Sequence, residues 1–297
     1  GIRDVAPSRG LGDVYKREHI SFSIAGGTIM GLVGENGAGK STTIRGILGL
    51  IRRECGEVLF CGEPLNTDSV AMKEQIGVVF DSLCFSPELT VEKAGKICRS
   101  IYSNWDEAYF QELLQQFSLL PKQKVKELSR GMSMKLSLVL AFAHHPKLLI
   151  LDEPTNGLDP AGIQEMRALI QDMPAATGAT VLISSHLLGE MEQMVEQVGI
   201  IDHGHMLFEG PLAELQRHSR GSVTLRLLDP AKAAPILRAH GIAADGGCVT
   251  LPPLRDDLLA ALVQQLAMNG AGVVELTPHT KTLEEIFLSL TANEEAD

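Results

Sequence analysis

The segment Thr28-Ile-Met-Gly-Leu-Val33 runs directly into Gly34-Glu-Asn-Gly-Ala-Gly-Lys40-Ser41. Its first six residues are apolar enough for a buried strand, and the residues from Thr42 to Ile51 predict a helix. The eight residues between them match G-x-x-x-x-G-K-[ST], a pattern that belongs between a strand and a helix. Glycines there let the backbone turn its N–H groups toward a phosphate, and the helix N-terminus adds positive charge. The segment predicts a phosphate-binding loop; the alternative is a chance glycine-rich turn.

The side chains of this loop suit a nucleotide and its metal ion. Lys40 brings a mobile cation to the outer phosphates, and Ser41 offers a hydroxyl to Mg²⁺. We expect ATP to contact the whole loop: Gly34, Glu35, Asn36, Gly37, Ala38, Gly39, Lys40, Ser41 and Thr42.

A second apolar strand, Leu148-Leu-Ile-Leu151, ends in the two carboxylates Asp152 and Glu153. Buried charge is costly without a partner, and Mg²⁺ would partner Asp152. Glu153 is placed to orient a water molecule that attacks the γ-phosphate. The alternative is that both carboxylates cap the helix that follows Pro154.

Strands and helices alternate over most of the chain. This order predicts an α/β fold with a mixed, largely parallel sheet. The phosphate-binding loop makes this a P-loop NTPase core, and the helical stretch near residues 82–130 is expected to be an inserted helical subdomain. Individual predictions include a strand over Ile20–Ile24 and a helix over Leu187–Val198. Composition shifts after Arg217–Gly221. We therefore predict an ATPase domain over 13–220, a small α+β domain over 222–292, a poorly ordered start over 1–12 and a tail over 293–297.

Composition excludes several classes of protein. The chain of 297 residues is 44% apolar, enough for real cores, and its formal net charge of −11 argues against a nucleic-acid partner. No run of residues is long and apolar enough to cross a membrane, and no signal-peptide core is visible. The five cysteines show no C-x-x-C pair and no zinc spacing, as expected for reduced thiols.

Three further motifs follow in a fixed order. Leu128-Ser129-Arg130-Gly131-Met132 precedes an apolar helix, Asn156-Gly157-Leu158-Asp159 follows the second strand, and Ser184-Ser185-His186 ends a third. Together with the loop and Asp152–Glu153, they make the first 220 or so residues resemble the nucleotide-binding subunit of an ABC transporter.

The resemblance implies that two copies enclose two ATP molecules. Ser129, Gly131, Met132 and Asp159 would then face the nucleotide held by the opposite copy. It also implies catalytic roles for Lys40, Glu153 and His186, with His186 hydrogen-bonded to the γ-phosphate and the attacking water. From the residues alone, an N-cap is the favoured interpretation of Ser129, and the alternative for Asp159 is a solvated acid or helix cap.

The chain departs from the family pattern at three places. Arg130 and Met132 replace a Gly and a Gln of the signature. Asp81 stands where the family has a Gln, and we carry it over as a third Mg²⁺ neighbour beside Ser41 and Asp152. Tyr15 is the only tyrosine near the place of the adenine-stacking aromatic, and its spacing is short.

The segment from Phe80-Asp-Ser-Leu-Cys84 to Met132, with the ending Thr282-Leu-Glu-Glu-Ile-Phe-Leu288, resembles bacterial exporter ATPases with a small C-terminal extension. This implies an ATPase at the cytoplasmic face of the membrane that drives a separate permease to export a drug, antibiotic, peptide or lipid-like solute. The permease's short cytosolic helix would enter a groove supplied by residues 82–130. Two alternatives stay open: a soluble assembly or mechanical factor, and a module that holds ATP without hydrolysing it.

Overall fold

The computed structural model describes residues 2–7, 20–66, 68–218, 221–243, 246–279 and 281–294. The chain forms two compact units, Gly1–Leu212 and Ala213–Asp297. The division falls at the start of α8 (Leu212–His218), earlier than the boundary that the composition shift suggests.

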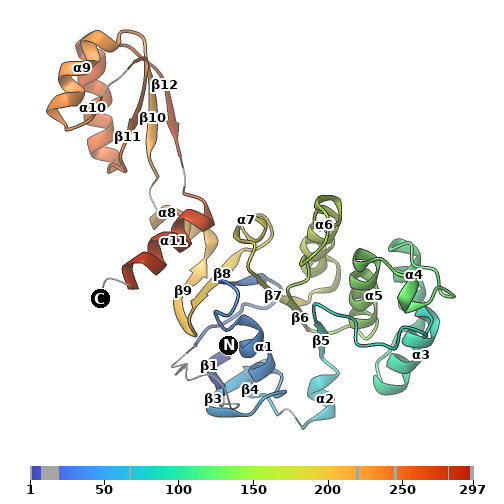
Figure 1. Cartoon of the computed structure of the whole chain (residues 1–297). Coiled ribbons are helices and arrows are strands. Elements are labelled where there is room, and N and C mark those ends of the chain that lie inside the picture. Colours follow the sequence, from blue (N-terminus) through green and yellow to red (C-terminus); the bar gives the residue numbers. More distant parts are fainter. Residues whose placement is uncertain are drawn as a thin grey trace. The chain divides into compact units, whose positions relative to one another are not determined.

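A six-stranded sheet forms the centre of the first unit (Figure 1). In spatial order its strands are β5 (Ile76–Val79), β6 (Leu148–Asp152), β7 (Thr180–Ser185), β2 (Ile29–Val33), β8 (Gln197–Asp202) and β9 (His205–Pro211). All neighbouring pairs are parallel except β8 and β9. This confirms the predicted mixed, largely parallel sheet. Because β2, β6 and β7 are parallel neighbours, their carboxyl ends meet at one edge.

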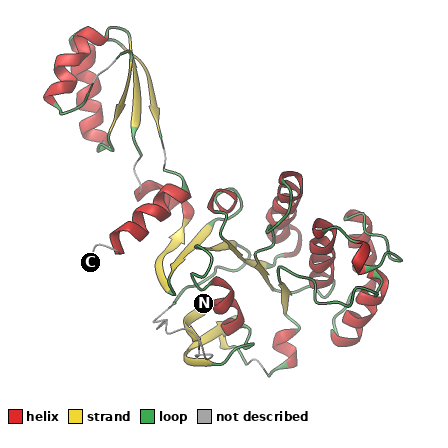
Figure 2. Ribbon diagram, in the orientation of Figure 1, coloured by secondary structure: helices red, strands yellow, loops and turns green. Residues whose placement is uncertain are grey.

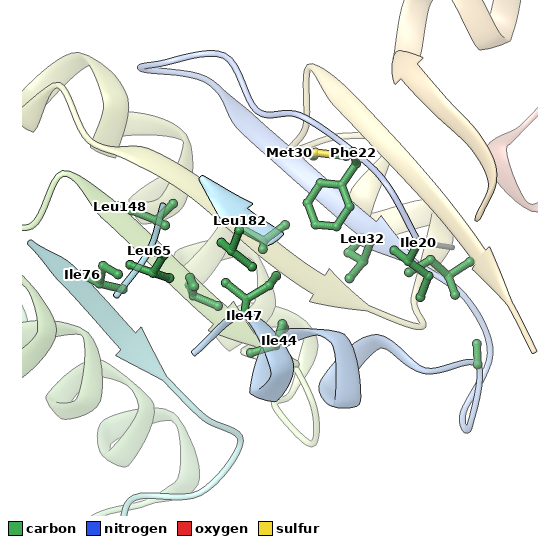
Figure 3. Packing of buried hydrophobic residues seen from close by; sticks show 14 residues of the cluster. Ile20, Phe22, Met30, Leu32, Ile44, Ile47, Leu65, Ile76, Leu148 and Leu182 are labelled. Atoms are coloured by element: carbon green, nitrogen blue, oxygen red, sulfur yellow. The ribbon is translucent and has the colours of Figure 1, made fainter. Parts of the chain in front are cut away.

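The core lies on both faces of this sheet. On one face, Ile44 and Ile47 of α1 (Lys40–Ile47) pack against apolar strand residues such as Leu32 and Leu182 (Figure 3). The alternate positions face other helices. A Cβ atom at Gly31 would lie 3.3 Å from the sulfur of Met191 in α7 (Leu188–Met191). A Cβ at Gly77 would lie 2.8 Å from a carbonyl oxygen of α5 (Arg130–Phe142). Strands buried on both faces explain the continuous apolar runs in the sequence.

A second, antiparallel sheet in this unit has the order β1 (Ile2–Pro7), β3 (Arg53–Phe60) and β4 (Glu63–Pro64). The sequence predicted a poorly ordered start over 1–12, but residues 2–7 pair with β3. Residues 1 and 8–12 lie outside the described part of the chain, as does Tyr15.

The helical segment contains α3 (Val91–Ile101), α4 (Glu107–Gln116), a 3₁₀ turn (Val125–Glu127) and the start of α5. Thr90 and Asp106 cap the first two helices by accepting hydrogen bonds from Lys93 N and Tyr109 N. Figures 1 and 2 show α3, α4 and α5 grouped beyond the β5 edge of the sheet. The remaining helices are α2 (Val70–Lys73) and α6 (Pro160–Thr177). Within the described ranges, no helix combines the length and apolar character that a membrane span requires.

Two local predictions differ from the structure. Ile20–Ile24 is not a continuous strand: only Phe22 forms a β-bridge, and the backbone N–H of Ser23 donates to the Glu209 side chain, although Ile20 and Phe22 are buried in the core. The helix predicted over Leu187–Val198 ends at Met191, since the residues from Gln197 onward pair with β2 as strand β8.

The second unit has its own antiparallel sheet, with the order β11 (Cys248–Leu251), β10 (Val223–Leu227) and β12 (Val273–Pro278). Helices α9 (Pro230–Ala239) and α10 (Asp256–Met268) cover it, as Figure 2 shows for this unit alone. Leu225, Leu237 and Leu266 are fully buried in a separate cluster. α11 (Leu283–Glu294) contains the first two residues of the predicted tail, and residues 295–297 are not described.

Candidate nucleotide site

The loop between β2 and α1 has a shape that glycine makes possible. Gly37 and Gly39 have φ angles of 91° and 116°, which L side chains rarely adopt. At Gly34 a Cβ atom would lie 2.2 Å from the carbonyl oxygen of Ile201, so no side chain fits there. The backbone N–H of Gly204 donates to Ala38 O at 2.8 Å and ties the loop to the β8–β9 turn.

The first backbone amides of α1 lie at this loop. The N–H groups of Lys40, Ser41 and Thr42 have no acceptor among the described residues. Such amides at a helix N-terminus form an anion-binding site. Lys40 is 5% exposed, and its ammonium group donates to Gly34 O at 2.7 Å and Glu35 O at 3.0 Å. A buried cation with backbone carbonyls as its neighbours stands beside the free amides.

Asp152 lies at the end of β6 and is buried, with 5% exposure. Ser41 Oγ donates to Asp152 Oδ1 at 2.9 Å, and Ser184 Oγ donates to the same oxygen at 2.7 Å. A buried carboxylate therefore meets hydroxyl groups from the loop helix and from β7. All three groups are oxygen donors, the ligand type that Mg²⁺ prefers.

Glu153 follows directly and turns its carboxylate back toward Lys40. Its φ of 52° is unusual for a residue with a side chain, and its N–H donates to Ser184 Oγ at 3.1 Å. Glu153 Oε1 lies 3.2 Å from Lys40 Nζ, and Oε2 lies 2.8 Å from His186 Nδ1. The left-handed turn thus directs this carboxylate between a cation from the loop and an imidazole from the end of β7.

Lys40, Ser41, Asp152, Glu153 and His186 form one connected group in the structure. Asp81 does not join it. Asp81 follows β5 in an exposed loop and forms no hydrogen bond or ion pair with any described residue. Its assignment as a Mg²⁺ neighbour has no contact in this structure to support it.

Two of the motif residues act as helix caps here. Ser129 Oγ accepts from Met132 N at 3.2 Å at the start of α5, and Asp159 Oδ1 accepts from Gly162 N at 3.0 Å at the start of α6. Both residues are exposed. These contacts agree with the capping alternatives and leave other faces of both side chains accessible.

Ser184 belongs to the site, but the sequence analysis assigned no separate role to its side chain. It is fully buried and bridges Asp152 and the Glu153 amide. The signal is the pair Ser184-Ser185 after an apolar strand, opposite Asp152 in the register of β6 and β7. Polar side chains at the carboxyl end of a buried parallel strand indicate a site.

These features define a P-loop nucleotide-binding protein, and comparisons with known proteins give the family. Residues 17–156 match the family model described as ABC transporter. The bacitracin transport ATP-binding protein BcrA of Bacillus licheniformis is 34% identical over 92% of this chain and 91% of its own. The linearmycin resistance ATP-binding protein LnrL of Bacillus subtilis strain 168 is 30% identical over 92% of each. The structure of cbiO1 from Clostridium perfringens, part of the ABC transporter complex cbiONQ, aligns with a TM-score of 0.62 and 25% identity over 72% of this chain and 90% of its own.

The chain belongs to the ABC transporter family, as an ATP-binding subunit. Subunits of this kind bind and hydrolyse ATP, so the chain is an ATP hydrolase that serves a transporter.

Proposed function

We propose that two copies of the chain enclose two ATP molecules, each held between the Lys40 loop of one copy and the Ser129 turn of the other. The observation that carries this proposal is the free amide row of Lys40, Ser41 and Thr42 beside the buried Lys40 ammonium. A triphosphate would supply the anion that these amides lack. Gly131, Met132 and Asp159 would complete the enclosure from the opposite copy.

In this proposal Glu153 orients the attacking water and accepts its proton, while His186 contacts the γ-phosphate and the same water. Glu153 already lies within 3.2 Å of Lys40 Nζ and 2.8 Å of His186 Nδ1, so phosphate oxygens would enter between groups that are in place. Ser41 and Asp152 fit Mg²⁺, because two oxygen atoms that can ligate a metal lie 2.9 Å apart in a partly buried setting. The metal would neutralise phosphate charge; the protein's own residues orient the reactants.

We propose further that the helical segment docks a membrane permease. A groove runs along β5, from the ends of α1 and α2 on one side to the end of α3 on the other. One cavity there, of about 290 Å³, is lined by Leu48, Leu50, Leu65, Asn66, Lys73, Ile76, Val78, Phe80 and Tyr102. A second, of about 310 Å³, shares Val78, Phe80 and Tyr102 and reaches Phe85 and Ile101. Leu50 and Ile101 are more than 60% exposed. An apolar groove of this kind suits one amphipathic helix.

The direction and solute follow from the named relatives. BcrA carries the description bacitracin transport, and LnrL linearmycin resistance. Resistance by transport requires removal of the compound, so we propose that this chain powers export of an antibiotic, peptide or lipid-like solute from the cytoplasmic face of a membrane.

The test is the Glu153→Gln variant. Replacing the carboxylate by an amide keeps the shape of the side chain but removes the proton acceptor. ATP turnover should therefore fall by roughly 10²-fold or more while ATP binding persists. Light scattering with Mg·ATP should then show a stable dimer of Glu153→Gln. The double variant with Lys40→Ala should stay monomeric, because it lacks the loop cation. Unchanged turnover, or a monomer at saturating ATP, would refute the proposed site.

The transport proposal has its own measurement. The chain should co-purify from detergent-solubilised membranes with a multispanning protein. This association should depend on the exposed residues of the groove. Leu50→Asp should abolish co-purification without lowering ATP turnover. A soluble scaffold recovered in place of a membrane protein would favour the assembly-factor alternative.

A further inference from the structure

Arg130, the first residue of α5, reaches across to the turn that precedes α6. Its guanidinium group lies over Gly157: a Cβ atom at position 157 would be 2.7 Å from Arg130 Cζ and Nη1 and 2.9 Å from Nε. A Cβ atom that close would require the flexible end of the Arg130 side chain to move. In this structure Arg130 occupies space that is open because residue 157 has no side chain.

The backbone conformation at position 157 also favours glycine. Its φ of 70° lies in the left-handed region, where glycine pays no steric cost. Arg130 has no ion pair or hydrogen bond to a described residue, and its planar group lies over the exposed Gly157. Lysine has no plane to stack in this way.

Gly131 lies near the same turn: a Cβ atom at position 131 would be 3.8 Å from Leu158 Cδ2. The N-terminus of α5 is therefore close to the 156–159 turn at Gly157 and at Leu158. That turn begins three residues after Glu153 and ends at the Asp159 cap of α6.

We propose that Arg130 is a positioning residue, which clamps the Ser129 turn to the Gly157–Leu158 turn and sets how Ser129 is presented to the nucleotide on the opposite copy. The inference rests on the ATP-enclosing dimer proposed above. Ser129 caps α5 one residue before Arg130, so a shift of the Arg130 contact moves Ser129 with the first turn of the helix. On the other side of this contact, Glu153 lies three residues before the 156–159 turn.

A double-mutant cycle tests the clamp. Arg130→Gly restores the residue that is usual in related signatures and should fold. In the Glu153→Gln background, the ATP concentration for half-maximal dimerisation should rise about fivefold with Arg130→Gly. Gly157→Ala should raise it as well, since the methyl group displaces Arg130. With both changes the increase should equal that of the larger single change, because each removes the same contact.

The backbone strain of alanine at φ 70° is present in both halves of the cycle and cancels. Arg130→Lys should behave like Arg130→Gly, because the stacked plane is lost although the charge is kept. In the chain with native Glu153, KM for ATP should rise about fivefold while kcat changes less than twofold. A general loss of structure would not produce that separation.

Lys135→Ala is the matched control. Lys135 also joins α5 to α6, through an ion pair of 2.6 Å with Glu165, but away from both turns. It should leave the dimerisation midpoint unchanged. Multiplicative effects of Arg130→Gly and Gly157→Ala, or full activity of Arg130→Lys, would overturn the clamp. Failure of Glu153→Gln itself to dimerise would refute the enclosed dimer instead.

Discussion

The site depends on single residues whose side chains serve two neighbours each. Glu153 has one carboxylate oxygen at Lys40 and the other at His186, and its own backbone N–H is held by Ser184. A positive φ at a residue with a side chain costs of order 1–3 kcal/mol and persists only where surrounding contacts enforce it. Ser184 supplies such a contact, so Ser184 supports the direction in which Glu153 points.

Replacing Ser184 by alanine should therefore impair catalysis more than folding. The change removes the hydroxyl that donates to Asp152 at 2.7 Å and accepts from Glu153 N at 3.1 Å. Loss of these buried bonds should lower the free energy of unfolding by about 1–3 kcal/mol. We expect kcat for ATP hydrolysis to fall about tenfold or more, measured at saturating Mg·ATP.

Ser185→Ala is the control for this prediction. Ser185 is equally buried, but among the described residues its hydroxyl accepts only from the nearby Leu187 N at 3.0 Å. It should lower stability with little change in kcat. Equal kcat values for the two variants would contradict a positioning role for Ser184.

At the scale of elements, His144 marks the joint between the helical segment and the sheet. Its ring is fully buried and stacks on Tyr102, with centroids 4.0 Å apart and planes 9° from parallel. The carbonyl groups of Ile76 and Leu140 face it, and the charges nearby are those of Glu74 and His145. Burial lowers the pKa of His144 below its ordinary value of about 6.5. Burial therefore favours the neutral form of this imidazole in the folded protein.

The lowered pKa makes folding stability depend on pH. Below about pH 6.5 the unfolded chain binds a proton at His144 that the folded chain does not, so the free energy of unfolding falls as pH decreases. The fall is at most about 1.4 kcal/mol per pH unit for one proton and ends at the folded pKa. His144→Phe keeps a ring against Tyr102 and removes the proton. Urea midpoints at pH 7.5, 6.5 and 5.5 should show a smaller fall for His144→Phe.

The control variant is His145→Asn. His145 is exposed, has a φ of 51° that asparagine tolerates, and bonds Asp106 at 3.1 Å. This variant should retain the fall in stability below pH 6.5. If His144→Phe retained the same fall, the neutral buried imidazole would not be its source.

The helices and strands also show which features the sequence could predict and which it could not. Long apolar strands such as Leu148–Asp152 and the loop from Gly34 to Ser41 were readable, because burial on both faces and the glycine pattern leave local signals. The helix predicted over Leu187–Val198 was wrong beyond Met191. Residues 197–200 pair with β2, and pairing across the sheet outweighed their helical periodicity.

The same distinction holds for the site. The residue types in the loop and at Asp152 and Glu153 could be predicted, since each sits at the end of a recognisable element. Neither the bridging role of Ser184 nor the Arg130–Gly157 contact could be predicted, because both depend on which strand or helix ends lie side by side. Asp81 was placed by motif position alone, and the fold leaves its side chain exposed with no contact to the group around Asp152.

At the scale of the molecule, the two units have separate cores, and this predicts separate unfolding. Leu237 is fully buried among residues of the second unit, and truncating it to alanine should cost about 2–5 kcal/mol there. Nucleotide binds residues of the first unit and stabilises only the state that binds it. In calorimetry of the whole chain, Leu237→Ala should lower the midpoint temperature of the second unit's transition. Mg·ATP added to Glu153→Gln should raise the midpoint temperature of the first unit's transition. Met268→Ala removes a side chain that is 75% exposed and should move neither. A single transition that responds to both changes would mean that the two cores unfold as one.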